Sequence, residues 1–336
     1  MQCLPFVHPQ ASPPVNQPSL FATPDGNHSA AGGSSPSPDE TILRRVRLKR
    51  LLLQNAPVCA QTEEKLRLCI SAALQNPGSL FRAELALQMA DAFGLLARQS
   101  EAIACAVEYF HIASLLLDDL PSMDDSLERR GHICLHLLFG ENSAILTALS
   151  LITRAYSLLG ECIAQTPAHF QQLAHHWIER CLGSRGILNG QARDLAFQRE
   201  SHRSRYAEKT ALQKTASLIV LPMLLPAILA GKGKQSLLEL RRLAICWGLL
   251  YQGIDDLADT AAATTASTGK TRGRDLALGR PNVALQLGPD ATYQYLSRLA
   301  TISGTCIARL NAMHPSLAFL QTFHAQMEQR RNRLQA

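Results

Sequence analysis

The sequence predicts an all-α protein. Leu and Ala dominate the chain and aromatic residues make up only 5% of it, a composition that favours helices over strands. Apolar residues recur at helical spacing through most of the chain, and no segment shows sustained alternation of apolar and polar residues, so we expect no real sheet. About eleven helices in one domain predict a large bundle around a central cavity.

Pro and Gly residues separate the predicted helices. Breaks are expected at Asn76-Pro77-Gly78, near Gly131 and Gly140, and after Ala230. Residues 260–271 are rich in Ala, Thr, Ser and Gly, and are predicted to form a mobile loop. The expected helices cover residues 42–53, 62–74, 82–96, 100–120, 143–162, 167–181, 187–200, 205–229, 235–257, 291–313 and 315–334.

The first 38 residues differ in composition from the rest of the chain. They are rich in Pro, Ser, Gly, Asn and Gln, and such a segment cannot bury enough apolar surface to offset its ordering entropy. We therefore expect residues 1–38 to be a disordered tail and residues 39–336 to be a single domain. Ser37, Pro38 and Asp39 are typical of a helix start.

A basic cluster follows this helix start. The run RRVRLKR covers residues 44–50, whereas the net charge of the whole chain is only +6. Such a face can meet nucleic acid or a membrane surface, but no aromatic residues are interleaved with it. We interpret it as the solvated face of the first helix and expect no nucleic-acid partner.

Composition also bears on the compartment. No stretch of about 18 uncharged apolar residues occurs, and the nearest candidate, residues 216–230, contains Pro222 and Pro226, so we expect a buried, kinked helix and no transmembrane segment. The N-terminus has no signal-peptide pattern. Nine scattered cysteines without CxxC pairs predict buried free thiols and a cytoplasmic protein.

An acidic motif, DDLPSMDD, covers residues 118–125 and closes an apolar helix. Four carboxylates at the end of an apolar element are costly unless something pairs with them, and a helix C-terminus has the wrong dipole sign for acids. A bound cation resolves both problems, and hard oxygen ligands suit Mg²⁺.

A second acidic motif, DDLAD, covers residues 255–259 and also closes an apolar helix. Asp255 and Asp259 are four residues apart and share a helix face, which Gln252 joins. Either motif alone is typical of a solvated helix end. Two such motifs facing each other across a bundle predict a site that holds several Mg²⁺ ions against a diphosphate.

The order of these and further motifs resembles that of the trans-prenyl diphosphate synthase (polyprenyl synthetase) family. From about residue 40 onward the chain carries DDxxxxD, RRG, QxxD, KT, QxxDDxxD and GKxxGxD in the family's order. Within the family, the chain is most similar to the geranylgeranyl diphosphate synthases of bacterial carotenoid pathways. The resemblance implies an isoprenoid-synthase-type helical bundle, prenyl diphosphate substrates and a homodimer.

The resemblance also implies a metal site and residue roles. Mg²⁺ is the expected cofactor, with three ions per site and Mn²⁺ as an alternative. The implied metal ligands are Asp118, Asp119, Asp124, Asp255, Asp256 and Asp259. The implied ligands of the allylic diphosphate are Arg129, Lys214, Lys270 and Arg280. The implied ligands of isopentenyl diphosphate are Arg82, His111 and Arg130, and the residues nearest the chemistry are Lys214, Thr215 and Gln252.

Other residues implied by the resemblance line the cavity. Gln191 and Asp194 form the QxxD of a central helix. Ala113 and Ser114 are small and leave room for a growing chain, and Tyr109 and Phe110 lie one turn deeper as a predicted floor, which suggests a C20 product. Each has a plainer interpretation: Gln191 as a buried amide bonded to backbone, His111 as a core histidine, and Ala113 as a site of close helix packing.

The chain departs from the family pattern in the segment 78–83. Where the family has GKRxRP, this chain has GSLFRA, so that Ser79 and Leu80 replace a lysine and an arginine and only Arg82 is kept. After RRG, the family's KPxxH is reduced to His136. Loss of one charge-assisted phosphate contact typically costs about 1.5–3 kcal/mol. The isopentenyl diphosphate site is therefore expected to be weakened while the allylic half is complete.

Three functions compete on this basis. The leading one is condensation of an allylic diphosphate with isopentenyl diphosphate to give geranylgeranyl or farnesyl diphosphate. The second is a class I terpene synthase that ionises a prenyl diphosphate alone, although the scarcity of aromatics counts against it. The third is a non-catalytic subunit of a heteromeric synthase, against which the complete acidic motifs argue.

Overall fold

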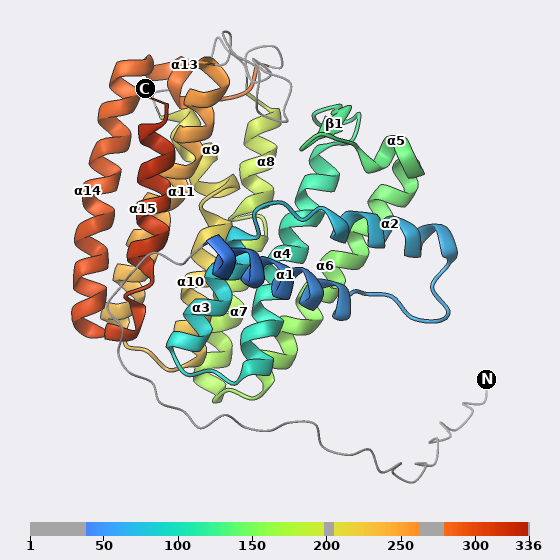
Figure 1. Cartoon of the computed structure of the whole chain (residues 1–336), viewed down its shortest axis with the longest axis horizontal. Helices are drawn as coiled ribbons and strands as arrows, with labels where there is room; N and C mark the ends of the chain where they lie inside the picture. The colour runs from blue at the N-terminus through green and yellow to red at the C-terminus, as the bar shows by residue number, and fades with distance from the viewer. Residues whose placement is uncertain (1–37, 198–204, 262–278, 335–336) are drawn as a thin grey trace. The chain divides into compact units, whose positions relative to one another are not determined.

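The computed structural model describes residues 38–197, 205–261 and 279–334. These residues form helix after helix (Figure 1), and their only strands are two residues long, so the all-α prediction is confirmed. The predicted tail 1–38 lies outside the described residues except for Pro38, the first residue of α1. The single domain over residues 39–336 stays a prediction.

The helices follow the predicted order. The elements are α1 (Pro38–Gln54), α2 (Glu64–Gln75), α3 (Phe81–Ala92), α4 (Ala97–Asp118), β1 (Glu128–Arg129), β2 (His132–Ile133), α5 (Leu135–Phe139), α6 (Glu141–Ala164), α7 (Ala168–Leu182), α8 (Ile187–Leu195), α9 (Tyr206–Lys214), α10 (Ser217–Leu229), α11 (Lys234–Ala261), α13 (Val283–Leu287), α14 (Pro289–Met313), a 3₁₀ turn η1 (Pro315–Leu317) and α15 (Leu320–Asn332).

Local chemistry explains several of these boundaries. Glu63 caps α2 by accepting a hydrogen bond from the backbone N–H of Leu66, and Asn282 caps α13 in the same way. Gly94, with a φ of +76°, separates α3 from α4. The sequence patterns did not reveal the short helices α5 and α13, or the β1–β2 hairpin.

The core of the bundle is built around α10 and α4. Helix α10 is buried on all sides, with Pro222 and Pro226 inside it, as expected for a buried helix. It packs against α3, α7 and α11, while α4 packs against α3 and α6. Because α4 and α11 carry the two acidic motifs near their C-terminal ends, this packing sets the distance between the motifs.

Within the described ranges, two helices are long and apolar enough, by length and composition alone, to cross a membrane. These are α4 and α6, and α9 with α10 would qualify as a third, bent segment. In the bundle, 78% of the most apolar window of α4 is buried, but only 44% of that of α6. Burial within the protein therefore accounts for the apolar character of α4, whereas α6 keeps an exposed apolar face.

The predicted helix 205–229 is in fact two helices, and this is a correction. Helices α9 and α10 are bent by 44° relative to each other, with Thr215 and Ala216 at the elbow. Two glycines of neighbouring helices lie against this elbow: a Cβ on Gly190 would come within 2.3 Å of the Lys214 backbone nitrogen, and one on Gly248 within 2.3 Å of the Ala216 Cβ. The elbow places Lys214 and Thr215 at the acidic motifs.

Gly248→Ala should therefore destabilise the protein. An added methyl group cannot fit against Ala216 without moving α10 or α11, and overpacking of this kind typically costs about 1–3 kcal/mol. Thermal unfolding measures the effect. Gly304→Ala is the matched control, because Gly304 lies within α14 and nothing lies within 4 Å of its added Cβ. The control should be neutral or slightly stabilising, and equal loss in both variants would contradict the close packing described here.

Candidate active site

The first acidic motif lies where α4 ends. Asp118 is the last residue of α4, and the chain then folds back tightly: the Asp124 backbone N–H donates to the Asp118 carbonyl (2.9 Å) and the Ser126 N–H to the Asp119 carbonyl (3.1 Å). This turn holds the backbone of residues 124–126 against that of residues 118–119, and the metal-ligand roles of these aspartates stay predictions.

Asp119 pairs with Arg129 of β1. The shortest distance between the guanidinium and the carboxylate is 2.5 Å, and Arg129 Nε lies 2.7 and 2.8 Å from the two carboxylate oxygens. Asp119 is only 4% exposed, so the pair neutralises a buried charge. The connection from β1 to β2 is a two-residue turn in which Arg130 and Gly131 both have positive φ, 55° and 77°.

Lys214 lies between two carboxylates. Its Nζ is 2.7 Å from Asp194 Oδ2 and 3.6 Å from Asp118 Oδ2. Burial raises the pKa of Asp118 to about 6, while Lys214 opposes this shift and Asp124 adds to it. Burial alone would lower the pKa of Lys214, but Asp118 and Asp194 together raise it.

Arg280 braces the first motif against α8. Its guanidinium donates to Asp124 Oδ1 (2.7 Å), to the Met123 carbonyl (3.0 Å) and to the Asp194 carbonyl (3.2 Å). Arg280, which is predicted to bind a diphosphate, is thus hydrogen-bonded to Asp124, a predicted metal ligand.

The first two aspartates of the second acidic motif, Asp255 and Asp256, make different contacts. Asp255 pairs with Arg330 of α15 at 2.5 Å, and this guanidinium also lies over the Tyr251 ring, 4.9 Å from its centre. Asp256 is 1% exposed and accepts hydrogen bonds from Gln252 (2.8 Å) and from the Val283 backbone N–H (2.7 Å).

These contacts fix the position of Asp256, and its metal-ligand role stays a prediction. Its two carboxylate oxygens hold the first residue of α13 and the amide of Gln252. The Gln252 amide oxygen in turn accepts from the Thr215 hydroxyl (2.6 Å). Thr215, Gln252 and Asp256 therefore form one hydrogen-bonded chain, and Asp259 follows one turn later on α11.

Two of the three residues predicted for isopentenyl diphosphate, Arg82 of α3 and His111 of α4, lie together, whereas Arg130 lies in the β1–β2 turn. Arg82 Nη1 is 3.4 Å from His111 Nε2, and the Arg82 guanidinium lies 5.8 Å from the centre of the Tyr251 ring. Glu108 lies beneath them and accepts from the Ala83 backbone N–H at 3.3 Å. Burial raises the pKa of Glu108 to about 7, with Arg82 and then Arg130 opposing it.

The predicted cavity residues diverge in direction. Ala113 is buried, and the Ser114 hydroxyl donates to the His111 carbonyl (2.8 Å). The Tyr109 hydroxyl donates to the Leu52 carbonyl of α1 (2.5 Å), whereas the Phe110 ring meets Tyr156 of α6 edge to face. The two aromatics therefore contact different helices, and their role as a cavity floor stays a prediction.

The plainer interpretation of Gln191, a buried amide bonded to backbone, requires a hydrogen bond that is not found among the described residues. Both polar atoms of its amide are buried, and no partner for them lies among the described residues. Buried polar groups without partners are rare and often belong to functional sites. Lys270 lies outside the described residues.

Comparison with known proteins identifies the family of this chain. The family model for polyprenyl synthetase matches residues 63–303, more than half of the chain. The chain belongs to the polyprenyl synthetase family. The subgroup of bacterial carotenoid enzymes stays a prediction.

Among curated relatives of this family are two from Arabidopsis thaliana. Geranylgeranyl pyrophosphate synthase 6, mitochondrial, is 36% identical over 207 residues, which cover 58% of this chain and 60% of that protein. Geranylgeranyl pyrophosphate synthase 10, mitochondrial, is 31% identical over 252 residues, which cover 74% of this chain and 72% of that protein. The predicted cytoplasmic location stays a prediction.

Solved structures support the predicted isoprenoid-synthase fold. A geranyltransferase from Helicobacter pylori, in a complex with magnesium and isoprenyl diphosphate, matches with a TM-score of 0.74 at 24% identity and covers 89% of this chain and 99% of that one. A geranyltransferase from Legionella pneumophila also matches with a TM-score of 0.74, at 22% identity, and covers 87% of this chain and 96% of that one.

Three residues of this polyprenyl synthetase site were missed from sequence. Arg330 lies in the C-terminal helix, 75 residues from Asp255, and only its place in an Arg-Arg pair marks it. Tyr251 precedes Gln252 and lies between two guanidinium groups. Glu108 stands three residues before His111, and an acid inside an apolar helix was the available signal.

Glu108→Gln should make stability less dependent on pH. Because the folded protein raises the pKa of this acid from 4.5 to about 7, the wild type loses stability as pH rises between these values, by roughly 3 kcal/mol at most. The amide carries no charge, so the variant should gain on the wild type over this range and keep its advantage above pH 7.

Thermal unfolding of both proteins between pH 4.5 and 8 checks this expectation. Glu64→Gln serves as the control, because the Glu64 side chain is 79% exposed. A difference between wild type and Glu108→Gln that does not change with pH would contradict the assignment.

Proposed function

We propose that the protein is a trans-prenyltransferase that condenses an allylic prenyl diphosphate with isopentenyl diphosphate to give geranylgeranyl or farnesyl diphosphate. The observation that carries the proposal is the direct pairing of predicted diphosphate ligands with the predicted metal ligands: Arg129 with Asp119, Lys214 with Asp118, and Arg280 with Asp124. The names of the curated relatives support the same activity.

The aspartates suit Mg²⁺ as the cofactor. Asp118, Asp119 and Asp124 would hold it from one side, and Asp255, Asp256 and Asp259 from the other. Among the described residues, no three acidic, His or Cys side chains gather closely enough to hold a metal ion. In the structure Arg129, Lys214 and Arg280 pair with three of these carboxylates, and the hard oxygen donors match magnesium's preference.

When bound, Mg²⁺ would neutralise charge on the leaving diphosphate. We propose three ions per site, with Mn²⁺ as an alternative. Arg129, Lys214 and Arg280 would donate hydrogen bonds to the diphosphate of the allylic substrate, for which guanidinium forks are well shaped.

The reaction balances without a further reactant. The allylic C–O bond breaks and its electron pair leaves with the diphosphate. The double bond of isopentenyl diphosphate attacks the allylic cation, and a proton passes to the departing diphosphate. The Thr215–Gln252–Asp256 chain fixes the Gln252 amide beside the elbow at which Lys214 holds the leaving group.

Incubation of the purified protein with Mg²⁺ and farnesyl diphosphate tests the function. With isopentenyl diphosphate present, mass spectrometry should find a C20 diphosphate; without it, no product is expected. Asp119→Asn should lower the rate at least about 100-fold, because it removes a carboxylate at the centre of the charge cluster. Asp290→Asn, on an exposed residue of α14, is the matched control and should retain activity.

Two other outcomes would redirect the assignment. Hydrocarbon or alcohol released from farnesyl diphosphate alone would indicate a terpene synthase. Absence of any magnesium-dependent diphosphate release would favour the non-catalytic subunit.

We also propose that the protein is a homodimer that assembles through α6. Ile145, Leu146, Leu149 and Tyr156 follow helical spacing along one exposed face of α6, and their exposed fractions range from 38 to 52%. A contiguous apolar face of this kind is typical of a protein interface. A second copy of the chain presents the same face, as a two-fold interface requires.

Leu146→Glu with Leu149→Glu should convert the dimer to a monomer, because two buried charges would oppose each other across the interface. Light scattering coupled to size-exclusion chromatography measures the mass. Leu238→Glu is the matched control: Leu238 is 52% exposed on α11, away from this face. A monomeric wild type, or a double variant that remains dimeric, would contradict the proposal.

A further inference from the structure

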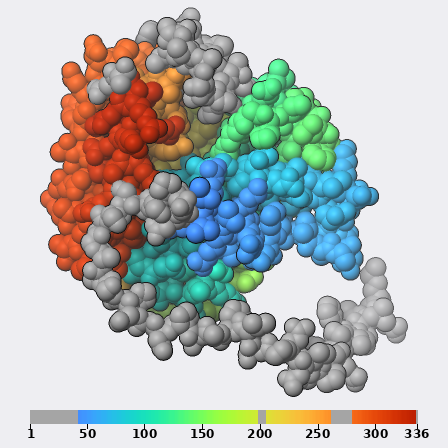
Figure 2. Space-filling view, in the orientation of Figure 1, coloured from blue at the N-terminus to red at the C-terminus, as the bar shows by residue number. Residues whose placement is uncertain are grey.

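The basic cluster of α1 lies next to the loop in which Ser79 and Leu80 replace the lysine and arginine of the family pattern. Residues Asn76–Leu80 connect α2 to α3, and α1 packs against both of these helices. Figure 2 shows α1, in blue, on the surface beside the lighter blue α2. Arg45 donates to the Gly78 carbonyl at 2.5 Å. The cluster is therefore not simply a solvated helix face.

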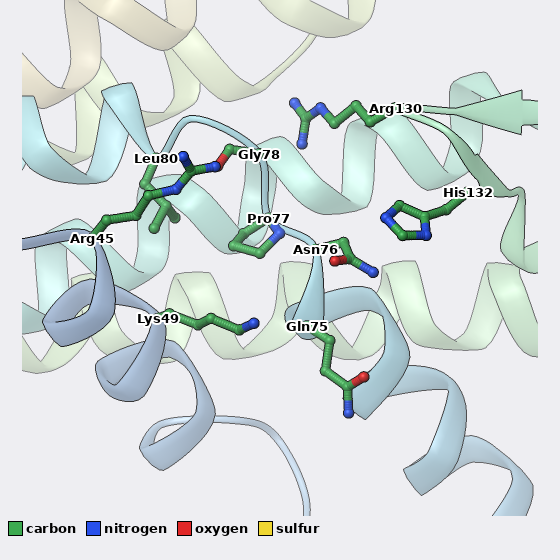
Figure 3. A pocket seen from close by; sticks show the side chains of 9 residues that line it. All are labelled: Arg45, Lys49, Gln75, Asn76, Pro77, Gly78, Leu80, Arg130 and His132. Atoms are coloured by element: carbon green, nitrogen blue, oxygen red, sulfur yellow. The ribbon is translucent and has the colours of Figure 1, made fainter. Parts of the chain in front are cut away.

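A cavity of about 290 Å³ opens between this loop, α1 and the hairpin. Three cationic side chains line it, Arg45, Lys49 and Arg130, together with His132 (Figure 3). None of the described residues that line it carries a carboxylate. Its volume is at the low end for small-molecule sites, which suits a charged headgroup better than a prenyl chain.

The arginines of α1 fall into two groups. Arg44 pairs with Glu84 (3.7 Å) and Arg47 with Glu101 (3.3 Å). In the described part of the chain, no carboxylate lies within the 4 Å pairing distance of Arg45, Lys49 or Arg130. Of the α1 cations without such a partner, which are Arg45, Lys49 and Arg50, the first two line the cavity. Three adjacent positive charges without an acid favour a multiply charged anion.

Gly78 allows these groups to approach one another. It has a φ of +86°, and a Cβ at this position would come within 2.0 Å of Arg130 Nη1. The peptide of Gly78 therefore lies between Arg45 on one side and Arg130 on the other. Leu80 lines the cavity but is 2% exposed and has no polar side-chain group. Ser79 is exposed but uncharged.

We infer that Arg45 and Lys49, with Arg130, bind the diphosphate of the acceptor substrate in this protein. The two α1 cations take over the charge that Ser79 and Leu80 do not supply. The ligand class is a short homoallylic diphosphate, and the inference rests on the proposed function. Arg82, which follows this loop in α3, lies 3.4 Å from His111 of α4, and neither residue lines the cavity.

Charge-removing variants test this inference. Arg45→Gln and Lys49→Gln should each raise the KM for isopentenyl diphosphate about tenfold, and the double variant about 100-fold, since each charge-assisted contact is worth about that much. The KM for the allylic diphosphate should change less than twofold. Arg44→Gln and Arg47→Gln remove the same charge from the same helix and should leave both constants unchanged.

A charge transplant sharpens the test. Ser79→Lys in the Arg45→Gln/Lys49→Gln background returns a cation to the loop and should recover at least tenfold of the lost KM. Unchanged KM for isopentenyl diphosphate in the double variant would overturn the inference while leaving the proposed function in place.

Direct binding separates the two proposals. Calorimetry with isopentenyl diphosphate alone, without allylic substrate, should give a dissociation constant that weakens at least tenfold in the double variant. If the wild type makes no product but binding still depends on Arg45 and Lys49, the anion site stands and the proposed function fails. Equal binding by wild type and double variant would remove the site whatever the activity.

Discussion

The cost of burying carboxylates at the ends of apolar helices determines how this structure is arranged. Asp118, Asp119 and Asp256 are each at most 9% exposed. A buried charge left alone would cost several kcal/mol. The chain meets that cost with Arg129 and Lys214 at the first motif and with neutral hydrogen-bond donors at Asp256.

The cations come from separate parts of the bundle. Arg129 lies on a hairpin, Lys214 at the elbow of α9 and α10, Arg280 just before α13, and Arg330 on the last helix. Each pairing therefore also ties one element to an acidic motif. The site therefore lies where these elements meet. Gly190 and Gly248 lie against the elbow that positions Lys214, so close packing there affects the geometry of the site.

Sequence reasoning succeeded where a single physical rule acts locally. Helical periodicity identified almost every long helix, because each buries one face against a neighbour. The family resemblance implied that Lys214, Thr215 and Gln252 share a site; in the structure Lys214 lies 3.6 Å from Asp118 and the Thr215 hydroxyl donates to Gln252, while their roles stay predictions. The elbow was missed because nothing within residues 205–229 demands it: the glycines that lie against it belong to other helices.

The roles of charged residues were harder to predict than their presence. The sequence shows that Arg45 and Arg330 are basic but not which carboxylate or carbonyl lies opposite. Asp256 matches a metal-binding motif as well as Asp255 does, yet Asp255 pairs with Arg330 while Asp256 is buried and bonded to Gln252 and to the Val283 N–H. Such assignments depend on contacts between residues far apart in the chain.

The hairpin after α4 has a consequence for the order of folding. Asp119 and Arg129 are ten residues apart, whereas Asp124 and Arg280 are separated by 156 residues. Closing a short loop costs less entropy than closing a long one, and local contacts form faster. We expect the hairpin to neutralise Asp119 early, so that α4 can enter the collapsing core before its distant partners along the chain have arrived.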